Sequence, residues 1–526
     1  MKKPKKWSFV IHPIMFAMFF ILALYSANVA EVSPSAVAIP LFSAMGFALL
    51  LLLSAWLIFR NAGKAAIIVS IFLILFFSYG YVSNAVEGLG ITYKVLWPIW
   101  CILIICSAYL VKRTRRDLHN LTVILNIVAI ALVIVPTINI AANEIEAASQ
   151  GITTTKNGYD PGANTSKTDS LPDIYYIVLD RYASESTLKE VYDFDNSEFT
   201  DYLSNRGFYV ASESRSNYPE SPQSLASSLN MKYINYLSEE LGEDYSDMEP
   251  LYDMLQDYEV WHFLKSEGYE FIHMGSWWEP TRKNEYADMN FNYWEIPEFS
   301  MTLYKTTMLY PIALENALLP QWVKAPLVQD FRMGQWNRVQ YKFDKLAEIP
   351  DMKEPTFVFA HMLIPHNPFV FDRNGNYLTA EEVNNRSVEV NYIGQLVFAN
   401  NKVRELIDEL LSGSEIPPII ILQSDEGSYP GGQDKWIGEG EWKEAVGWEE
   451  ATRAELREKV TILNAYYLPD VNRDILYPSI TPVNSFRLVF NLYFDTDFEL
   501  LPDRSYAFYR DHPYKFFEIT DMVNCD

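Results

Sequence analysis

Residues 172–182 read PDIYYIVLDRY, and this stretch indicates how the C-terminal part of the chain folds. The run Ile174–Leu179 consists of β-branched, aromatic and other apolar residues, which predicts a strand, and it ends in Asp180. Similar short runs alternate with amphipathic stretches of helical period as far as the C-terminus. This alternation predicts an α/β domain, in which a mostly parallel sheet carries helices on both faces.

Two further predicted strands also end in polar residues. Thr356–Ala360 ends in His361, and Ile419–Leu422 is followed by Gln423, Ser424, Asp425 and Glu426. Ligands of open α/β sheets bind at the carboxyl ends of the strands, so the polar residues at these three strand ends are expected to converge on one site. Each of these ends, taken singly, is also compatible with an ordinary strand-to-helix turn, where Asp and Ser are common.

Ser221 and Pro222 form a helix-start signature, with Ser221 expected as the N-cap and Pro222 at the first helical position. An N-cap hydroxyl lies among free backbone N–H groups at the positive end of the helix dipole. These groups stabilise the charge that develops when a phosphate or sulfate is attacked. Ser221 is therefore a candidate nucleophile, although ordinary capping explains most Ser-Pro pairs.

Two of the seven histidines, His361 and His366, fall in the stretch HMLIPHNPFVFD at 361–372. Pro365 and Pro368 flank His366, which predicts a rigid, irregular loop rather than a core face. A lone histidine is usually packed or solvated. Two histidines in one strand-exit loop are better candidates for binding an anion or a metal ion.

The N-terminal part contains five segments that are long and apolar enough to span a membrane. They run roughly over 8–29, 37–59, 65–85, 92–111 and 121–141. Basic residues precede the first span and occupy alternate loops, at Lys2, Lys3, Lys5, Lys6, Arg60, Lys64, Lys112, Arg113, Arg115 and Arg116. By the positive-inside rule, the N-terminus is expected in the cytoplasm and everything after the fifth span outside it.

The predicted organisation is that of a multi-pass cell-membrane protein. A five-helix transmembrane anchor at 1–146 is followed by a flexible Ser-, Thr-, Gly- and Asn-rich linker at 147–172 and an extracytoplasmic domain at 173–526. The apolar, aromatic segment 299–324 is expected either in the core of that domain or toward the bilayer, where it would guide a lipid substrate.

Charge excludes some function classes. The net charge of −25 is the sum of +6 over residues 1–150 and −31 over residues 151–526. The strongly acidic second part argues against a nucleic-acid partner, because phosphate contacts need Lys and Arg. The spans carry almost no charge, with His12 the main ionisable group. This favours an anchor, with a lipid-substrate groove as an option, over a transporter.

Taken together, the motifs resemble those of the alkaline phosphatase superfamily, and in particular its membrane-anchored sulfatase-like proteins. This group includes lipoteichoic acid synthases and phosphoethanolamine transferases. The similar stretches are PDIYYIVLDRY at 172–182, SNYPESPQSLASSLN at 216–230, HMLIPHNPFVFD at 361–372, IIILQSDEG at 419–427, TPVNSFRLVFNLYF at 481–494 and LLPDRSY at 500–506. Their order and spacing, together with the multispan anchor, are more specific than any single motif.

The resemblance implies a hydrolase or transferase in which a metal-bound hydroxyl attacks phosphorus. Its implied metal ligands are Asp180, Ser221, Asp425 and Glu426, with Ser221 also the nucleophile. His366 would bind the charged group of the substrate or assist the leaving group, with His361 as a second substrate-binding residue. The cation lowers the pKa of the hydroxyl and neutralises charge in the transition state.

Two departures from the family pattern matter. The family usually reads Asp-His-Gly where this chain has Asp425, Glu426 and Gly427. The implied ligand set is then all oxygen, which favours Mn²⁺ or Mg²⁺ over Zn²⁺. The maturation motif of sulfatases, Cys or Ser followed by x-Pro-x-Arg, is absent at Ser221, which disfavours sulfate-ester hydrolysis.

The leading hypothesis is a metal-dependent phosphotransferase or phosphodiesterase that acts on a lipid-linked or cell-envelope phosphoester. The alternative is a catalytically degenerate domain that binds envelope polymer or a partner protein, since Glu426 stands in the place of the family's histidine.

Overall fold

The computed structural model describes residues 10–29, 32, 34–87, 92–149, 171–293, 298–311, 331–428, 447–509 and 511–524. Most of the predicted linker at 147–172 lies outside these residues. The chain forms two compact units. We call Met1–Gly151 with Glu295–Gln329 the membrane unit, and Ile152–Trp294 with Asp330–Asp526 the sheet unit.

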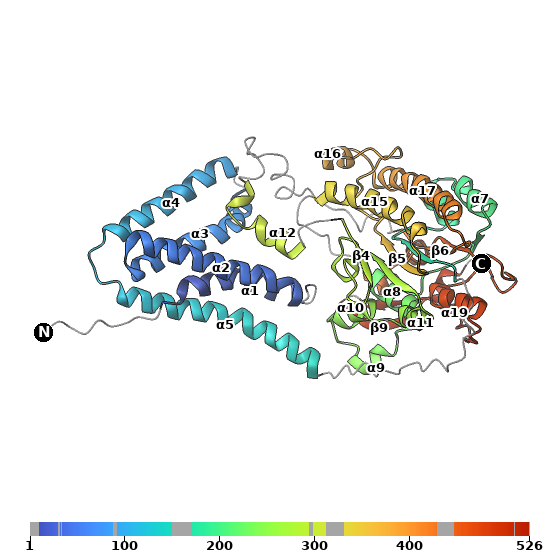
Figure 1. Ribbon diagram of the computed structural model, residues 1–526, viewed down its shortest axis with the longest axis horizontal. Helices are drawn as coiled ribbons and strands as arrows, with labels where there is room; N and C mark the ends of the chain where they lie inside the picture. The colour runs from blue at the N-terminus through green and yellow to red at the C-terminus, as the bar shows by residue number, and fades with distance from the viewer. Residues whose placement is uncertain are drawn as a thin grey trace. The chain divides into compact units, whose positions relative to one another are not determined.

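The membrane unit contains five apolar helices, one on each predicted span (Figure 1). They are α1 (His12–Ser26), α2 (Pro34–Phe59), α3 (Ala62–Glu87), α4 (Tyr93–Arg113) and α5 (His119–Ser149). Four of them, α2 to α5, are long and apolar enough to cross a membrane. The first has 15 residues, fewer than the roughly 20 that a bilayer core requires. The chain is therefore an integral membrane protein.

Small residues let these helices approach one another closely. Ala17, Ala48, Ala65 and Ala129 are completely buried, as is usual where membrane helices pack. His12 is buried as well, and its Nδ1 lies 2.6 Å from Ser70 Oγ, so it ties α1 to α3. This hydrogen bond gives the main ionisable residue of the spans a structural role.

A segment that lies between two strands of the sheet in sequence also belongs to the membrane unit. Helix α12 (Glu298–Lys305) and the residues after it pack on α2 and α3, where Phe299 and Met308 enter the same apolar core. The Gly80 N–H donates to the Thr306 carbonyl at 2.8 Å, and the Met308 N–H donates to the Phe76 carbonyl at 3.1 Å. Residues 299–311 therefore pack with the membrane helices and not in the core of the sheet unit, whereas 312–324 lie outside the described residues.

Gly80→Val is expected to release this segment from the membrane helices. A Cβ at position 80 would lie 2.5 Å from the Lys305 carbonyl oxygen and 2.6 Å from the Thr306 Cα, and both are backbone atoms that cannot move aside separately. Overpacking of this kind costs about 1–3 kcal/mol. Limited proteolysis of the full-length chain should show cleavage within 298–311 about tenfold faster than in the native protein.

The matched control is Gly46→Val on α2, because a Cβ at position 46 meets no atom within 4 Å. Equal cleavage rates for the two variants would contradict this docking.

The sheet unit is built on a seven-stranded sheet of order β2-β7-β6-β1-β5-β3-β4. Its strands are β1 (Ile174–Leu179), β2 (Tyr209–Val210), β3 (Glu270–Met274), β4 (Met289–Phe291), β5 (Thr356–Met362), β6 (Ile419–Gln423) and β7 (Asn464–Tyr467). The five strands from β6 to β4 in this order run parallel, whereas β7 and β2 are antiparallel additions at one edge. The prediction of a mostly parallel sheet is confirmed. A separate hairpin joins β8 (Tyr506–Tyr509) and β9 (His512–Glu518).

Helices cover both faces of the sheet, as predicted. Side chains of β1 alternate between two cores: Tyr176 and Val178 enter one, and Tyr175 and Ile177 enter the other. The helices of the first core are α8 (Ser221–Leu229), α9 (Leu237–Leu241), α10 (Glu249–Gln256), α11 (Glu259–Ser266) and α19 (Pro482–Tyr493). The helices of the second core are α6 (Glu185–Tyr192), α7 (Ser197–Asn205), α15 (Phe331–Ala347) and α17 (Val388–Gly413).

Three short helices complete the described part of the sheet unit. They are α16 (Ala380–Asn384), α18 (Arg453–Val460) and α20 (Thr520–Val523). The last two pack together in a small apolar cluster with Trp448.

Candidate metal centre and nucleophile

Three neighbouring strands bring distant parts of the chain to one edge of the sheet. Strand β1 lies between β6 and β5 and runs parallel to both, so the carboxyl ends of all three strands meet at the same edge. Asp180 directly follows β1, His361 lies near the end of β5, and Asp425 comes just after β6. A hydrogen bond of 3.0 Å from the Asp180 N–H to the Met362 carbonyl continues the β1–β5 ladder to this point.

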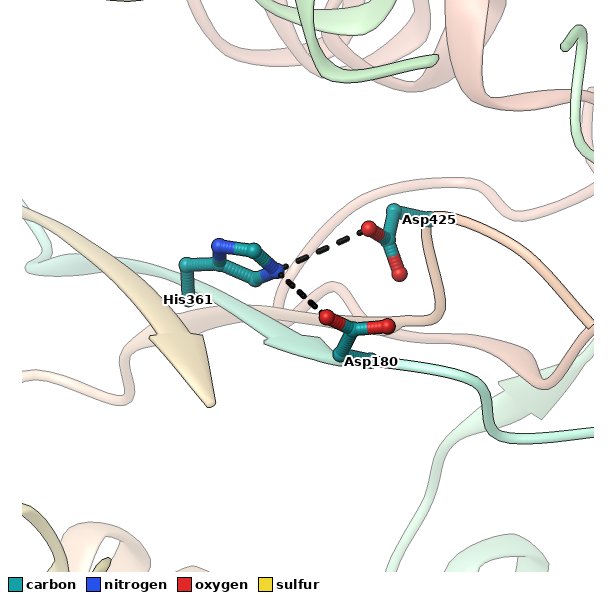
Figure 2. A group of neighbouring side chains, drawn as sticks. All are labelled: Asp180, His361 and Asp425. Atoms are coloured by element: carbon teal, nitrogen blue, oxygen red, sulfur yellow. Dashed lines mark ion pairs between the residues drawn. The ribbon is translucent and has the colours of Figure 1, made fainter. Parts of the chain in front are cut away.

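The side chains of Asp180, His361 and Asp425 form a compact, buried group (Figure 2). One ligand atom from each residue lies within 4.8 Å of the others. His361 Nε2 is 3.3 Å from Asp180 Oδ2 and 3.6 Å from Asp425 Oδ2. The convergence of strand ends that the sequence predicts is therefore present for these three residues.

The two buried carboxylates of Asp180 and Asp425 lie close together, so their negative charges repel one another. Burial raises the pKa of Asp180, the neighbouring Asp425 raises it further, and His361 only partly offsets both. Burial acts in the same direction on Asp425, but contacts with His361 and the Ser221 hydroxyl outweigh it and lower the pKa of that carboxyl. Burial opposes protonation of His361, yet the two carboxylates raise its pKa overall. A positive charge among these side chains would therefore stabilise the two buried carboxylates.

The chemistry of these side chains fits a divalent metal ion. Asp180 Oδ1, Asp425 Oδ2 and His361 Nε2 are buried and make no hydrogen bond with the residues that the structure describes. His361 Nδ1 lies 3.0 Å from Thr281 Oγ1, so the other ring nitrogen faces the two carboxylates. A hydrogen bond of this kind commonly orients a metal-binding histidine. Carboxylate oxygens and imidazole nitrogen together suit several divalent ions, zinc among them.

Ser221 lies at the start of α8, but not in the position predicted. Glu220 is the N-cap, and Ser221 and Pro222 are the first two helical residues, so the prediction of Ser221 as N-cap is wrong. A proline in the second position costs no helical hydrogen bond, because the first backbone N–H groups of a helix have no intrahelical partner. Ser221 is therefore in the first turn of α8, and its hydroxyl contacts the Asp425 carboxylate.

A second serine of α8 holds the helix to the strand end. Ser224 Oγ donates to the backbone carbonyl of Asp425 at 2.6 Å, and its side chain is completely buried. Two serines therefore link α8 to the turn after β6: Ser224 contacts the Asp425 backbone, and Ser221 contacts the Asp425 side chain.

Glu426 lies outside the group of Asp180, His361 and Asp425. Its Oε1 is 2.8 Å from Arg181 Nε and 2.8 Å from Lys459 Nζ, so its carboxylate is engaged by two cations. The preference for Mn²⁺ or Mg²⁺ depended on an all-oxygen set of ligands. Because the group contains the nitrogen of His361 instead of a Glu426 oxygen, that premise does not hold.

His366 is held beside Asp180 through the backbone, since its N–H donates to the Asp180 carbonyl at 3.2 Å. Its Nδ1 bonds the Asn367 carbonyl. Burial, and then the nearby Arg181, keep the pKa of His366 well below its usual value. The ring is therefore neutral, and its proton on Nδ1 leaves Nε2 as an acceptor.

Three residues near the group were not among the predicted site residues: Arg181, Thr281 and Lys459. Arg181 carried a signal, because it directly follows Asp180 at the end of β1. Thr281 and Lys459 follow no strand and belong to no recognisable motif, so nothing in their local sequence points to the site.

The sequence matches no family model, and no curated protein matches it significantly. Solved structures are similar to it at low identity. They include lipooligosaccharide phosphoethanolamine transferase A, an integral membrane protein from Neisseria meningitidis, with a TM-score of 0.37 at 12% identity over 91% of this chain and 95% of that chain.

Two isolated domains are similar in the same way. The C-terminal periplasmic domain of EcEptC from Escherichia coli has a TM-score of 0.40 at 12% identity, over 66% of this chain and 93% of that chain, and has also been solved in complex with Zn. The corresponding domain of phosphoethanolamine transferase EptC from Campylobacter jejuni has a TM-score of 0.36 at 11% identity, over 62% and 91%. Phosphoethanolamine transferases, one of the groups that the sequence motifs resemble, are thus among the solved structures to which the fold of this chain is similar.

Proposed function

We propose that this protein is a metal-dependent phosphotransferase or phosphodiesterase that acts on a lipid-linked or cell-envelope phosphoester. One observation carries the proposal: a serine hydroxyl at a helix N-terminus contacts a carboxylate of a buried Asp–His–Asp group. This arrangement joins a nucleophile, a place for a cation and free backbone donors in one site.

Asp180, Asp425 and His361 are the proposed metal ligands, together with Ser221. A divalent cation held there would lower the pKa of the Ser221 hydroxyl and offset the negative charge of the phosphoryl group. Ser221 Oγ loses its proton to solvent, forms a bond to phosphorus and displaces the ester oxygen, which takes up a proton from solvent and leaves as an alcohol. Water or a second alcohol then takes the phosphoryl group from the serine, which makes the overall reaction a hydrolysis or a transfer.

The chain's own groups assist this attack in two ways. Free N–H groups in the first turn of α8 face the charge that develops on the phosphoryl oxygens. The neutral ring of His366, attached to Asp180 through its backbone, is proposed to accept a hydrogen bond at Nε2 from the charged group of the substrate.

The membrane unit is proposed to keep the enzyme at its substrate. The positive-inside pattern supports a cytoplasmic N-terminus and an extracytoplasmic sheet unit. The α12 segment lies between β4 and β5 in sequence and packs on α2 and α3. It therefore supports a second chain connection between the sheet unit and the membrane unit. Phosphoesters linked to lipid or to envelope polymer would then be within reach.

Removal of metal tests this function. The purified full-length chain should hydrolyse bis(p-nitrophenyl) phosphate, a chromogenic phosphodiester. Exhaustive chelation should lower the rate about 100-fold or more, and addition of Mn²⁺, Mg²⁺ or Zn²⁺ in separate assays should show which ion restores it. Turnover that survives chelation would contradict the proposal, and so would the absence of turnover with all three ions. Tight metal binding without turnover of any phosphoester would favour the degenerate, binding-only alternative.

A further inference from the structure

A second set of charged side chains lies next to the metal group and has no role in the proposed mechanism so far. Glu426 Oε1 receives both Arg181 Nε and Lys459 Nζ, each at 2.8 Å. Lys459 is completely buried, Glu426 nearly so, and Arg181 retains 17% of its side-chain exposure. Two cations on one carboxylate oxygen make this a pair of positive groups held together by a shared acceptor. We call Arg181 and Lys459 the cation pair and Glu426 their shared acceptor.

Backbone contacts hold the cation pair in place. The Gly427 N–H donates to the Lys459 carbonyl at 2.6 Å, and a Cβ on Gly427 would lie only 2.3 Å from the Glu458 carbonyl oxygen. Only glycine therefore allows the turn after Glu426 to lie against the end of α18, where Lys459 is found. Arg181 has a φ of 63°, a left-handed conformation that is uncommon outside glycine and is retained only where its surroundings enforce it.

In three separate stretches of chain, a charged residue lies directly beside a proposed metal ligand or the proposed nucleophile in sequence. Arg181 follows Asp180, and Glu426 follows Asp425 and donates its N–H to Asp425 Oδ1 at 3.0 Å. Glu220 precedes Ser221 and accepts from Trp448 Nε1 at 3.1 Å, while Lys459 Nζ lies 5.7 Å from the centre of the Trp448 ring.

Both cations influence the pKa values of two residues beside the proposed site, Glu220 and His366. Burial raises the pKa of Glu220, and Lys459 and Arg181 act against this rise. The same two cations disfavour protonation of His366. The contacts of Glu426 and Trp448 agree with this, because they place the two cations next to residues that adjoin the proposed ligand Asp425 and the proposed nucleophile.

A phosphoester under attack has oxygens that the metal ion does not reach. Arginine and lysine are the side chains that bind such oxygens, and charge-assisted hydrogen bonds from them are among the strongest in proteins. Cations that are already fixed stabilise developing charge without reorganising during the reaction. The shared carboxylate of Glu426 fixes them in this way.

We infer that Arg181 and Lys459 bind the non-bridging oxygens of the phosphoester that Ser221 attacks, and that Glu426 is the residue that positions them, not a metal ligand. The site would thus recognise an anionic phosphoester by a metal ion together with two cationic side chains. This inference rests on the proposed function, but its test requires no turnover.

Two titrations of the full-length protein separate metal binding from anion binding. Calorimetric titration with Mn²⁺ measures metal affinity, and titration of the Mn²⁺-loaded protein with inorganic phosphate measures anion affinity. Lys459→Met and Arg181→Met should each weaken phosphate binding about tenfold or more and change Mn²⁺ affinity less than about threefold. Glu426→Gln should likewise leave Mn²⁺ affinity within about threefold of the native value.

Lys402→Met is the matched control, because Lys402 pairs with Glu405 on the surface of α17, and it should change neither titration. Thermal unfolding identifies any variant that fails to fold, and Arg181→Lys, which keeps the charge, should retain more phosphate affinity than Arg181→Met. Loss of Mn²⁺ binding in Glu426→Gln, or native phosphate affinity in both methionine variants, would overturn the inference. Absence of Mn²⁺ binding and turnover in the native chain would instead overturn the proposed function.

Discussion

Asp425→Asn is expected to abolish divalent-metal binding and, with it, turnover of a phosphodiester. The amide keeps the size of the side chain but removes a negative charge that lies 3.6 Å from His361 Nε2 in a buried group. Removal of one partner from a buried set of charges costs about 3–5 kcal/mol, so metal affinity should fall about 100-fold or more. Titration calorimetry with Mn²⁺ and Zn²⁺ measures the affinity, and release of p-nitrophenol measures turnover.

The control for this variant is Asp408→Asn. Asp408 is a partly exposed aspartate that pairs with Arg206 on the surface, so its loss should change neither measurement. Native metal affinity in Asp425→Asn would show that the buried Asp–His–Asp group does not hold the ion.

Ser221→Ala is expected to lower turnover about 1,000-fold or more while leaving metal affinity within about tenfold of the native value. The change removes the attacking oxygen but retains Asp180, His361 and Asp425, which supply the other proposed ligands. Steady-state rates with bis(p-nitrophenyl) phosphate and calorimetric titration with Mn²⁺ give the two quantities. Their separation distinguishes loss of the nucleophile from loss of the metal site.

Ser227→Ala provides the comparison within the same helix. Ser227 Oγ donates to the Lys232 carbonyl near the other end of α8, so its loss disturbs the helix but not the site. A Ser221→Ala protein with native turnover would require another nucleophile and would contradict the mechanism.

The parts of the site that could be predicted are those that depend on local pattern. Asp180 and Asp425 follow runs that only a strand satisfies, and parallel strands in one sheet must bring such residues to the same edge. The membrane helices were predictable for a similar reason, because a bilayer requires continuous apolar length. Ser221 was found through its proline, although the helix begins one residue earlier than the pattern indicated.

The roles of His361 and Glu426 depended on neighbours that are remote in sequence. His361 faces the two carboxylates because Thr281 occupies its other ring nitrogen. Glu426 lies outside that group, and its carboxylate is bound by Arg181 and Lys459. Lys459 belongs to a helix that no motif marks. The docking of α12 against Gly80 is a contact of the same kind, since it depends on the backbone fit between two distant segments.

Composition and periodicity thus specified the apolar helices, the parallel sheet and the edge at which its polar residues gather. These features follow from short-range rules that act on each stretch of chain separately. Which of the gathered side chains come within ligand distance of one another, and which form ion pairs instead, was decided only when the folded chain set the distances among them. Coulomb interactions and hydrogen bonds vary steeply with separation, and a linear sequence contains no such distances.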